Sequence, residues 1–265
     1  MEIPSWLALT GQVAIVTGCG SPSGIGVATA RALGQLGASV VMTATGDHIQ
    51  ERVRELRAEG LNVDGIAADL TSEGGSRSVL DFAIAAVGAP SILVNNAGMS
   101  SQGSVVESGA AADISEEEWH SGLRRNLDTA FHMSRAVIPH MRRHGFGRIV
   151  FVSSVTGPVM AMRSESAYAA AKAGMIGLMR SIAIDEAQFG ITANAVAPGW
   201  IATGAQTEDE AQNGIGVPLG RSGDPIEVAA IITALCSTGA GYTTGQVFTI
   251  DGGNAIAEER TTPRP

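Results

Sequence analysis

Short apolar runs recur along the whole chain, and each is separated from the next by a segment long enough for a helix. Each run is continuously apolar rather than alternating with polar residues, which is typical of strands buried on both faces of a parallel sheet. Strands that alternate with helices form a doubly wound sheet with helices on both faces. The sequence therefore predicts an α/β fold with strands at 13–17, 39–43, 63–68, 92–95, 148–153, 192–197 and 247–250.

The composition does not change along the chain, and neither a repeat nor a linker interrupts it. We therefore expect a single domain over residues 1–257, followed by a polar tail at 258–265. Two looser segments lie at 100–115 and 204–216. Long loops in a compact domain are often lids or pocket walls, so both segments are candidates for a binding site.

Charge and cysteine content restrict the partners of the chain. There are 17 Lys and Arg against 26 Asp and Glu, and the net charge of −9 argues against nucleic acid or an anionic membrane. No apolar run approaches the ~20 residues of a membrane helix, and residues 1–4 lack the basic start of a signal peptide. Cys19 and Cys236 are too few for a disulfide framework. We expect a cytoplasmic protein without a nucleic-acid partner, a membrane partner or a metal site.

The segment TGCGSPSGIG, Thr17–Gly26, follows the first predicted strand and can be matched to a dinucleotide-binding loop in two ways. The first match is Gly18-Cys19-Gly20-Ser21-Pro22-Ser23, which is close to the common dinucleotide fingerprint. The second runs from Gly18 to Gly24-Ile25-Gly26 and has a longer loop. Pro22 favours the longer loop, because it has no N–H and disfavours helical geometry at Ser21. The following helix is therefore predicted to begin at about 23–25.

Three glycines of this loop have distinct predicted roles. Gly18 allows the tight turn after the strand, and Gly24 lets the backbone approach a phosphate at the helix N-terminus. Gly26 is then the glycine at which helix and strand pack closely. The alternative is a plain strand–loop–helix turn that binds nothing.

Tyr168 and Lys172 are spaced to lie on one face of a helix. An ammonium near a phenol favours the phenolate and lowers the pKa of the tyrosine, so it can exchange protons with an alcohol or ketone. Ser154 follows the strand at 148–153, at the sheet edge where open α/β folds carry their sites. The alternatives are a surface pair for Tyr168 and Lys172, and a turn former or helix cap for Ser154.

Together with further motifs in the same order, these residues resemble the classical short-chain dehydrogenases/reductases from about residue 13 to 253. The further matches are Asp69-Leu70, Asn95-Asn96-Ala97-Gly98, Asn126, Pro198-Gly199-Trp200-Ile201-Ala202-Thr203 and Asp251-Gly252-Gly253. The resemblance implies a seven-stranded Rossmann-type sheet and a nicotinamide cofactor. It also implies hydride transfer between the nicotinamide and a carbonyl or secondary-alcohol carbon.

The resemblance assigns roles to four catalytic residues. Tyr168 is the general acid in reduction, Ser154 hydrogen-bonds the substrate oxygen, and Lys172 lowers the tyrosine pKa and holds the nicotinamide ribose. Asn126 holds a water in a proton relay, although by itself it could cap a helix irregularity. Donors at the substrate oxygen suit the reaction, because hydride arrival creates an alkoxide there.

The resemblance also implies a set of cofactor-binding residues. The alternatives are a helix cap for Asp69, turn chemistry for 95–96 and a rigid turn for 198–203. Including the two catalytic residues that touch the ribose, the set is Gly18, Ser21, Ser23, Gly24, Ile25, Gly26, Ala44, Thr45, Asp69, Leu70, Asn96, Ala97, Gly98, Tyr168, Lys172, Pro198, Gly199, Ile201 and Thr203.

NADP is predicted over NAD, without excluding NAD. In NAD enzymes of this fold an acid usually ends the second strand, and here that position is Ala44. Hydroxyls on Ser21, Ser23 and Thr45 could bind a 2′-phosphate. Neither the glycine loop nor the turn after Thr45 carries an Arg or Lys that would form an ion pair with that phosphate. Asp47 and Gln50 have the spacing of a capping box for the next helix.

Within the family the chain is most similar to 3-oxoacyl carrier-protein reductases and related ketone reductases, at 42–45 and 168–177. We therefore expect a 3-oxoacyl thioester or a ketone as substrate, in a pocket formed by Met99, Met160, Met162, Trp200 and 204–216. The cations at 142–144 could form part of a rim for an acidic carrier protein, or simply end a helix. Alternatives are an NAD-dependent secondary-alcohol dehydrogenase and a non-catalytic redox sensor, which would not need Asn126, Ser154, Tyr168 and Lys172 together.

The first loop carries two residues more than the commonest form of the family, and the gap from Ser154 to Tyr168 is one residue longer. We assign the second departure to a pocket wall at 159–165. Both departures affect how the loop binds the phosphates and how the pocket fits its substrate.

A homotetramer is expected, because the strand at 245–250 and the helices around Asn126 and Tyr168 carry more apolar residues than one sheet face needs.

Overall fold

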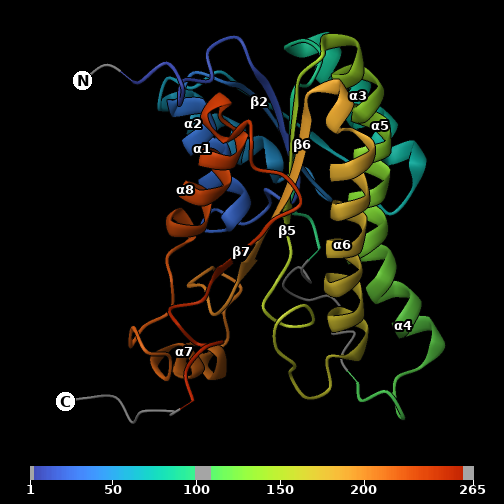
Figure 1. The fold of residues 1–265 in the computed structure, drawn as a ribbon, viewed down its shortest axis with the longest axis vertical. Coiled ribbons are helices and arrows are strands. Elements are labelled where there is room, and N and C mark those ends of the chain that lie inside the picture. Colours follow the sequence, from blue (N-terminus) through green and yellow to red (C-terminus); the bar gives the residue numbers. More distant parts are fainter. Residues whose placement is uncertain (1–2, 99–108, 259–265) are drawn as a thin grey trace.

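The structure, a computed structural model, describes residues 3–98 and 109–258 (Figure 1). Met99 and most of the predicted tail lie outside the described residues. Seven parallel strands form one sheet in the order β3-β2-β1-β4-β5-β6-β7, as expected from the apolar runs. The strands are β1 (Val13–Val16), β2 (Ser39–Ala44), β3 (Val63–Ala67), β4 (Ile92–Asn95), β5 (Gly147–Val152), β6 (Ile191–Pro198) and β7 (Val247–Ile250).

Helices cover both faces of the sheet, which confirms the doubly wound α/β fold. In Figure 1, α1, α2 and α8 lie on one side of the strands, and α3, α5 and α6 lie on the other. The helices are α1 (Ile25–Gln35), α2 (Ile49–Ala58), α3 (Glu73–Ala86), α4 (Glu116–Leu123), α5 (Thr129–His144), α6 (Ser166–Asp185), α7 (Glu208–Ile215) and α8 (Pro225–Cys236). Short helical turns are η1 (Arg124–Asp128), η2 (Ala187–Phe189) and η3 (Thr238–Ala240).

The two hydrophobic cores follow from the alternation of side chains along the strands. In β1, Ala14 and Val16 pack in the core under α1, α2 and α8, whereas Ile15 between them packs in the core under α3, α5 and α6. All three side chains are fully buried. Burial on both faces is the reason that this strand is continuously apolar.

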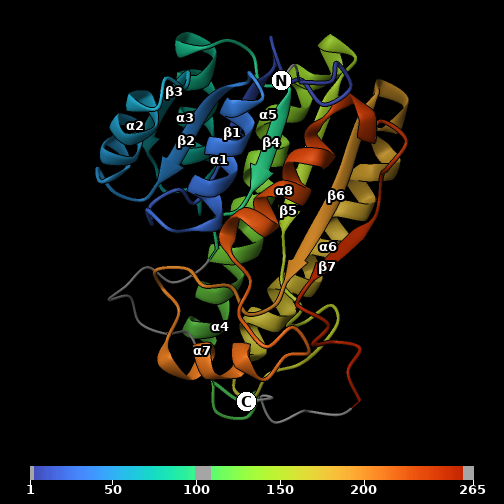
Figure 2. The same ribbon diagram turned by 90° about the vertical axis from the view of Figure 1, so that its left-hand side faces the viewer.

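The strand order reverses between β1 and β4, which are neighbours in the sheet although two strands separate them in the chain. Loops that leave such strands in opposite directions open a crevice at their carboxyl ends. Figure 2 shows β4 and β6 pointing toward the end of the molecule where α4 and α7 lie. The topology therefore predicts a binding cleft at that end.

The start of α1 agrees with the prediction based on Pro22. Gly24 is the extended N-cap residue, and the helix begins at Ile25. Before it, the Gly24 N–H bonds the Ser21 carbonyl at 3.3 Å, which closes a turn around the proline.

The predicted capping box of Asp47 and Gln50 is wrong. Helix α2 begins at Ile49, its N-cap residue is His48, and no side chain caps it. The Gln50 side-chain amide instead donates to the Gly65 carbonyl, 2.8 Å away. Gly65 is in β3, which pairs with β2, so a tertiary contact replaces the local one.

No helix among the described residues is long and apolar enough to cross a membrane.

Candidate active site

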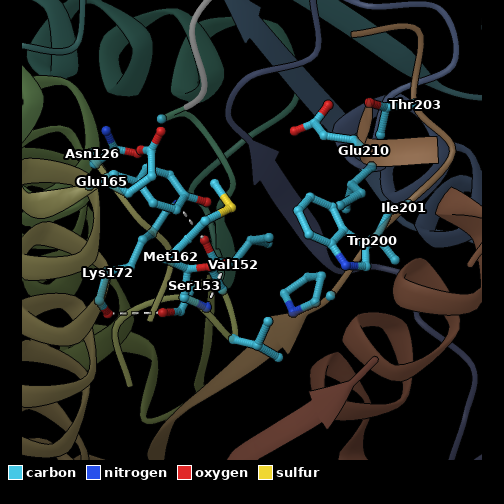
Figure 3. A pocket seen from close by; sticks show the side chains of 18 of the residues that line it. Asn126, Val152, Ser153, Met162, Glu165, Lys172, Trp200, Ile201, Thr203 and Glu210 are labelled. Atoms are coloured by element: carbon cyan, nitrogen blue, oxygen red, sulfur yellow. Dashed lines mark hydrogen bonds between the residues drawn. The ribbon is translucent and has the colours of Figure 1, made fainter. Parts of the chain in front are cut away.

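A cleft of about 490 Å³ lies at the carboxyl ends of the strands (Figure 3). Its walls come from the ends of β4, β5 and β6, from α4, η1 and α6, and from the segment that carries α7. Its lining includes these residues that the sequence predicts for the site: Ile25, Asn96, Gly98, Asn126, Ser154, Met160, Met162, Tyr168, Lys172, Pro198, Gly199, Trp200, Ile201 and Thr203.

Ser154 lies directly after β5, with only 9 % of its surface exposed. Its hydroxyl accepts a hydrogen bond from the Thr156 N–H at 3.1 Å, and it lies close enough to the Tyr168 phenol to lower the pKa of that group. The next backbone N–H, of Val155, donates to the Pro198 carbonyl on β6 at 3.0 Å. The serine is therefore held between the ends of the neighbouring strands β5 and β6, on the same cleft as the Tyr168 phenol.

Lys172 lies one helical turn beyond Tyr168 on α6, as the spacing predicts. Its ammonium nitrogen donates to the Val152 carbonyl at 3.0 Å and is 5.5 Å from the centre of the Tyr168 ring. The Ser153 hydroxyl donates to the Lys172 carbonyl at 2.9 Å, so helix and strand end are tied together (Figure 3). Lys172 is only 2 % exposed, which excludes the surface-pair alternative.

The pKa of Tyr168 is raised, which corrects the expectation that Lys172 lowers it. Burial of the phenol is the largest cause, and the negative charges of Glu165 and Glu210 add to it. The hydrogen bond with Ser154 acts in the opposite direction and is outweighed. Burial also lowers the pKa of Lys172 to about 8, since the ammonium loses its hydration.

Asn126 lies in the π-helical turn η1, between α4 and α5. Its side-chain amide donates to the Gly122 carbonyl at 3.1 Å, so it does bridge a helix irregularity. Its Oδ1 atom is buried and has no hydrogen-bond partner among the described residues. One end of the amide therefore stabilises the turn, and the other end is an acceptor on the cleft wall without a partner among the described residues.

The glycine loop fits a bound dinucleotide because two of its positions, Gly18 and Gly26, have no room for a side chain and a third, Gly24, carries none at the helix start. Gly18 has φ +71°, and a Cβ atom there would lie 2.9 Å from the Ala97 backbone. A Cβ at Gly26 would lie 2.6 Å from the Gly18 carbonyl oxygen. Gly24 gives α1 an N-cap without a side chain, which leaves its first N–H groups open to a phosphate.

The predicted loop partners of these glycines are also in place. The Asn96 side chain donates to the carbonyls of Thr17 and Gly18, at 2.9 and 3.0 Å, which braces the loop from β4. On the other side, a Cβ at Gly204 would lie 2.8 Å from the Ser23 hydroxyl and 3.3 Å from that of Ser21. The two loops are in contact across the cleft entrance.

Ala44, Thr45, Asp69 and Leu70 do not line the cleft. Ala44 ends β2 and is buried, whereas Thr45 is exposed. The Asp69 carboxylate accepts hydrogen bonds from the Thr71 N–H and hydroxyl, which hold its pKa below the usual range. It does not cap α3, whose N-cap is Ser72.

Sequence reasoning missed His48, which lies at the turn after β2. A Cβ atom at Gly20 would lie 2.6 Å from its Nε2 atom, and one at Gly46 would lie 2.8 Å from its Nδ1 atom. The imidazole of this exposed residue therefore lies between the enlarged glycine loop and the turn after β2. Only the pairing of these two loops in space brings it there, so no local pattern indicates it.

Two carboxylates on the cleft, Glu165 and Glu210, belong to the segments 159–165 and 204–216 that the sequence predicts as pocket walls, although neither residue was singled out. Glu165 directly precedes α6, three residues before Tyr168. Glu210 is on α7. Met160, Met162 and Trp200 line the cleft as predicted, while Met99 lies outside the described residues.

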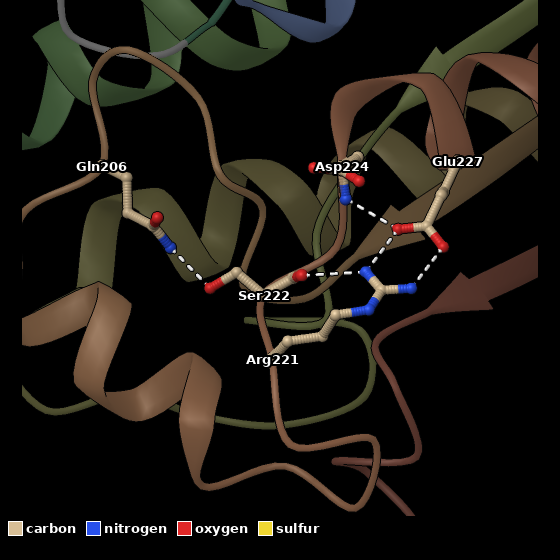
Figure 4. Close-up of polar contacts among 5 residues, drawn as sticks. All are labelled: Gln206, Arg221, Ser222, Asp224 and Glu227. Atoms are coloured by element: carbon tan, nitrogen blue, oxygen red, sulfur yellow. Dashed lines mark hydrogen bonds and ion pairs between the residues drawn. The ribbon is translucent and has the colours of Figure 1, made fainter.

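The segment between α7 and α8 is held at its base by polar contacts (Figure 4). Arg221 pairs with Glu227 through two hydrogen bonds of 2.7 and 2.8 Å, and the Asp224 N–H donates to the same carboxylate. These donors hold the pKa of Glu227 at about 2. Across the segment, Gln206 donates to the Ser222 hydroxyl at 2.9 Å, which anchors the chain that leads into α7.

Comparison with known proteins identifies the group to which this architecture belongs. The family model described as enoyl-(acyl carrier protein) reductase matches residues 18–255. The chain is 38% identical over 252 residues to the 3-oxoacyl-[acyl-carrier-protein] reductase FabG of Pseudomonas aeruginosa, covering 93% of this chain and 98% of that one. It is 33% identical over 262 residues to the oxidoreductase UcpA of Salmonella typhimurium, covering 94% and 97%.

Solved structures agree with the sequence relatives. A 7α-hydroxysteroid dehydrogenase, complexed with NADH and 7-oxo glycochenodeoxycholic acid, is 31% identical with a TM-score of 0.87 over 98% of this chain and 100% of that one. A putative gluconate dehydrogenase of Agrobacterium tumefaciens is 28% identical with a TM-score of 0.86, over 95% and 99%. The chain belongs to the short-chain dehydrogenase/reductase family, the nicotinamide-dependent oxidoreductases that interconvert carbonyl compounds and alcohols.

Proposed function

We propose that this chain reduces a ketone carbonyl with NADPH. The observation that carries the proposal is that Ser154, at the end of β5, and Tyr168 line one cleft close enough for the serine to lower the tyrosine pKa, with Lys172 one turn along α6. Two neighbouring hydroxyls on one cleft can both reach one substrate oxygen. That arrangement suits an oxygen that gains negative charge during the reaction.

In the proposed reaction the bound nicotinamide supplies a hydride to the carbonyl carbon. Tyr168 transfers its phenolic proton to the oxygen, and Ser154 donates a hydrogen bond to the same oxygen. The raised pKa of Tyr168 keeps the phenol protonated at neutral pH, which is the form needed for reduction. Lys172 faces the ring, and the open Oδ1 of Asn126 can hold a water that returns a proton to Tyr168.

The cofactor is proposed to lie along the glycine loop, with its pyrophosphate at the start of α1. Gly18, Gly24 and Gly26 provide the space, and Asn96 braces the loop. The other residues predicted to contact the cofactor, among them Ala44, Asp69 and Thr203, belong to the same proposal. A preference for NADP is supported by the absence of an acid at Ala44 and by the His48 imidazole between Gly20 and Gly46. His48 is a donor that can bind a 2′-phosphate.

For the substrate, two classes have support. A free ketone suits the apolar cleft wall of Met160, Met162 and Trp200. A 3-oxoacyl thioester is supported by the likeness to the reductase of Pseudomonas aeruginosa. The NADH in the steroid dehydrogenase keeps an NAD-dependent alcohol dehydrogenase as the alternative.

A panel of β-ketoacyl thioesters, ketones, diketones and secondary alcohols, each assayed with both cofactors, tests the proposed function. We expect turnover of a ketone or thioester, with kcat/KM higher for NADPH than for NADH. A higher value for NADH contradicts the cofactor proposal. A protein that binds dinucleotide but turns over nothing in the panel is a sensor, and the catalytic proposal fails.

A homotetramer is also proposed. Phe131 on α5 and Ile184 on α6 are 43% and 78% exposed, and Val159 borders a groove between α6 and β7. Apolar side chains at these positions suit two isologous interfaces. Light scattering at micromolar concentration tests this, and the mass of a monomer would refute it.

A cytoplasmic location is also proposed, since the two cysteines are too few for a disulfide framework.

A further inference from the structure

The cleft carries a carboxylate that carbonyl reduction does not require. Glu165 directly precedes α6 and lines the cleft, on the same wall as Asn126 in Figure 3. Its side chain makes no hydrogen bond or ion pair with any residue in the described part of the chain. It is half-buried, so its charge is only partly hydrated. A carboxylate in that condition is suited to a cationic or hydrogen-bond-donating ligand.

The backbone holds Glu165 in place on both sides. Ser164 adopts a left-handed conformation with φ +60°, and its carbonyl accepts from the Gly109 N–H at 2.6 Å. Gly109 pairs with Glu165 in an isolated bridge, and its carbonyl accepts from the Ser166 hydroxyl. A residue with positive φ other than glycine is costly and requires such support. The carboxylate is therefore presented from a fixed position.

An indole and a second carboxylate occupy the opposite wall. Figure 3 shows Trp200 and Glu210 across the cleft from Glu165, with Met162 between the walls. The Trp200 carbonyl accepts from the Gly223 N–H at 2.9 Å, and Glu210 accepts from the Thr207 N–H at 2.7 Å. An aromatic face combined with carboxylates is the environment in which proteins bind alkylammonium groups.

The positive charges of the cleft do not neutralise Glu165. Arg125 and Lys172 also line the cleft, and the Lys172 ammonium is bonded to the Val152 carbonyl. The pKa of Glu165 is raised by burial and then by the negative charge of Glu210, and neither cation is among the causes. Among the described residues that line the cleft, Glu165 is therefore not paired with a cation.

We propose that the natural substrate is a ketone that carries an alkylammonium group, bound between the Glu165 carboxylate and the Trp200 indole while its carbonyl meets Ser154 and Tyr168. This inference rests on the proposed carbonyl reduction and narrows its substrate class. Glu165 is the specificity-determining residue in it, and Glu210 adds to the attraction from the facing wall.

Two ketones of nearly equal shape and different charge test the proposal. Acetonyltrimethylammonium carries a quaternary ammonium where 4,4-dimethylpentan-2-one carries a tert-butyl group. With NADPH, we expect kcat/KM to be about tenfold or more higher for the cation, in keeping with partly buried cation–π and charge pairing. In Glu165→Gln the ratio should fall toward one, through loss of activity on the cation only. Trp200→Leu should lower the ratio as well.

Glu208→Gln is the matched control, because Glu208 is an exposed carboxylate on α7 that does not line the cleft. It should leave the ratio unchanged. Equal kcat/KM values for the two ketones, or a ratio that Glu165→Gln does not change, overturns the proposal. Better turnover of erythrulose, a neutral polyhydroxy ketone, than of either probe overturns it too and indicates that Glu165 accepts hydroxyl groups.

A binding measurement separates failure of this proposal from failure of the proposed function. Calorimetric titration of the two ketones into the protein needs no turnover. If neither ketone is reduced but the cation binds more tightly in a Glu165-dependent way, reduction is refuted and the ammonium site stands. If ketones are reduced without preference for the cation, only the ammonium site fails.

Discussion

The ammonium nitrogen of Lys172 lies 5.5 Å from the centre of the Tyr168 ring, and both side chains are held against the end of β5. The ammonium donates to a backbone carbonyl rather than to a carboxylate, so no negative charge offsets its burial. Its pKa of about 8 is the result. This pairing has consequences for stability as well as for chemistry.

The first prediction concerns the pH dependence of stability in the protein without cofactor. Between pH 8 and 10.5 the unfolded chain binds a proton on Lys172 that the folded chain has released, so unfolding becomes less favourable as the pH rises. The free energy of unfolding, taken relative to that of Lys172→Met, should rise by about 3 kcal/mol across this window. Urea denaturation of both proteins at several pH values measures it. A constant difference would show that Lys172 has an ordinary pKa, and a falling one that its pKa is raised in the folded protein.

The second prediction uses two glycines with similar backbone conformation. Gly18 and Gly60 have φ +71° and +83°, but only at Gly18 would a Cβ meet neighbouring atoms, at 2.9 Å from Ala97. Gly60→Ala should cost about 1 kcal/mol for the unfavourable φ alone. Gly18→Ala should cost about 3 kcal/mol or more, because the loop must also shift, and it should weaken cofactor binding. Equal losses of stability would contradict the close packing of this loop.

The third prediction concerns His48 and the 2′-phosphate. Because the imidazole lies between Gly20 and Gly46, His48→Ala should raise the Kd of adenosine 2′,5′-bisphosphate several-fold and leave that of 5′-AMP nearly unchanged. Calorimetry gives both values. His144→Ala, at the exposed end of α5, is the control and should alter neither. If His48→Ala weakens the two ligands equally, the residue supports the loop and does not read the phosphate.

The strands and the start of α1 could be predicted because their causes are local. Burial on both faces makes each strand continuously apolar, and Pro22 prevents a helix from starting earlier. Ser154, Tyr168 and Lys172 could be assigned together because their motifs resemble those of the short-chain dehydrogenases/reductases, and the fold brings all three to one cleft.

Features that depend on distant segments could not be predicted in the same way. The Gln50 side chain donates to the Gly65 carbonyl on β3. The local spacing of Asp47 and Gln50 therefore led to a wrong prediction of a capping box. The pKa of Tyr168 is raised because the folded protein buries the phenol, which the one-turn spacing to Lys172 does not reveal. His48 reaches its place through the path of the loop after β2, which sequence patterns do not determine.

The most direct test of the central claim is the turnover of Tyr168→Phe. The substitution removes the proposed proton donor and keeps the ring that packs against α6 and Lys172. We expect kcat to fall by ~10²–10⁴-fold, as is typical for the loss of a general acid, while the Kd of NADPH stays within about twofold of the native value because the ring still fills its place. Turnover close to that of the native protein, with cofactor binding intact, would contradict the assignment of Tyr168 as the acid and with it the proposed reaction.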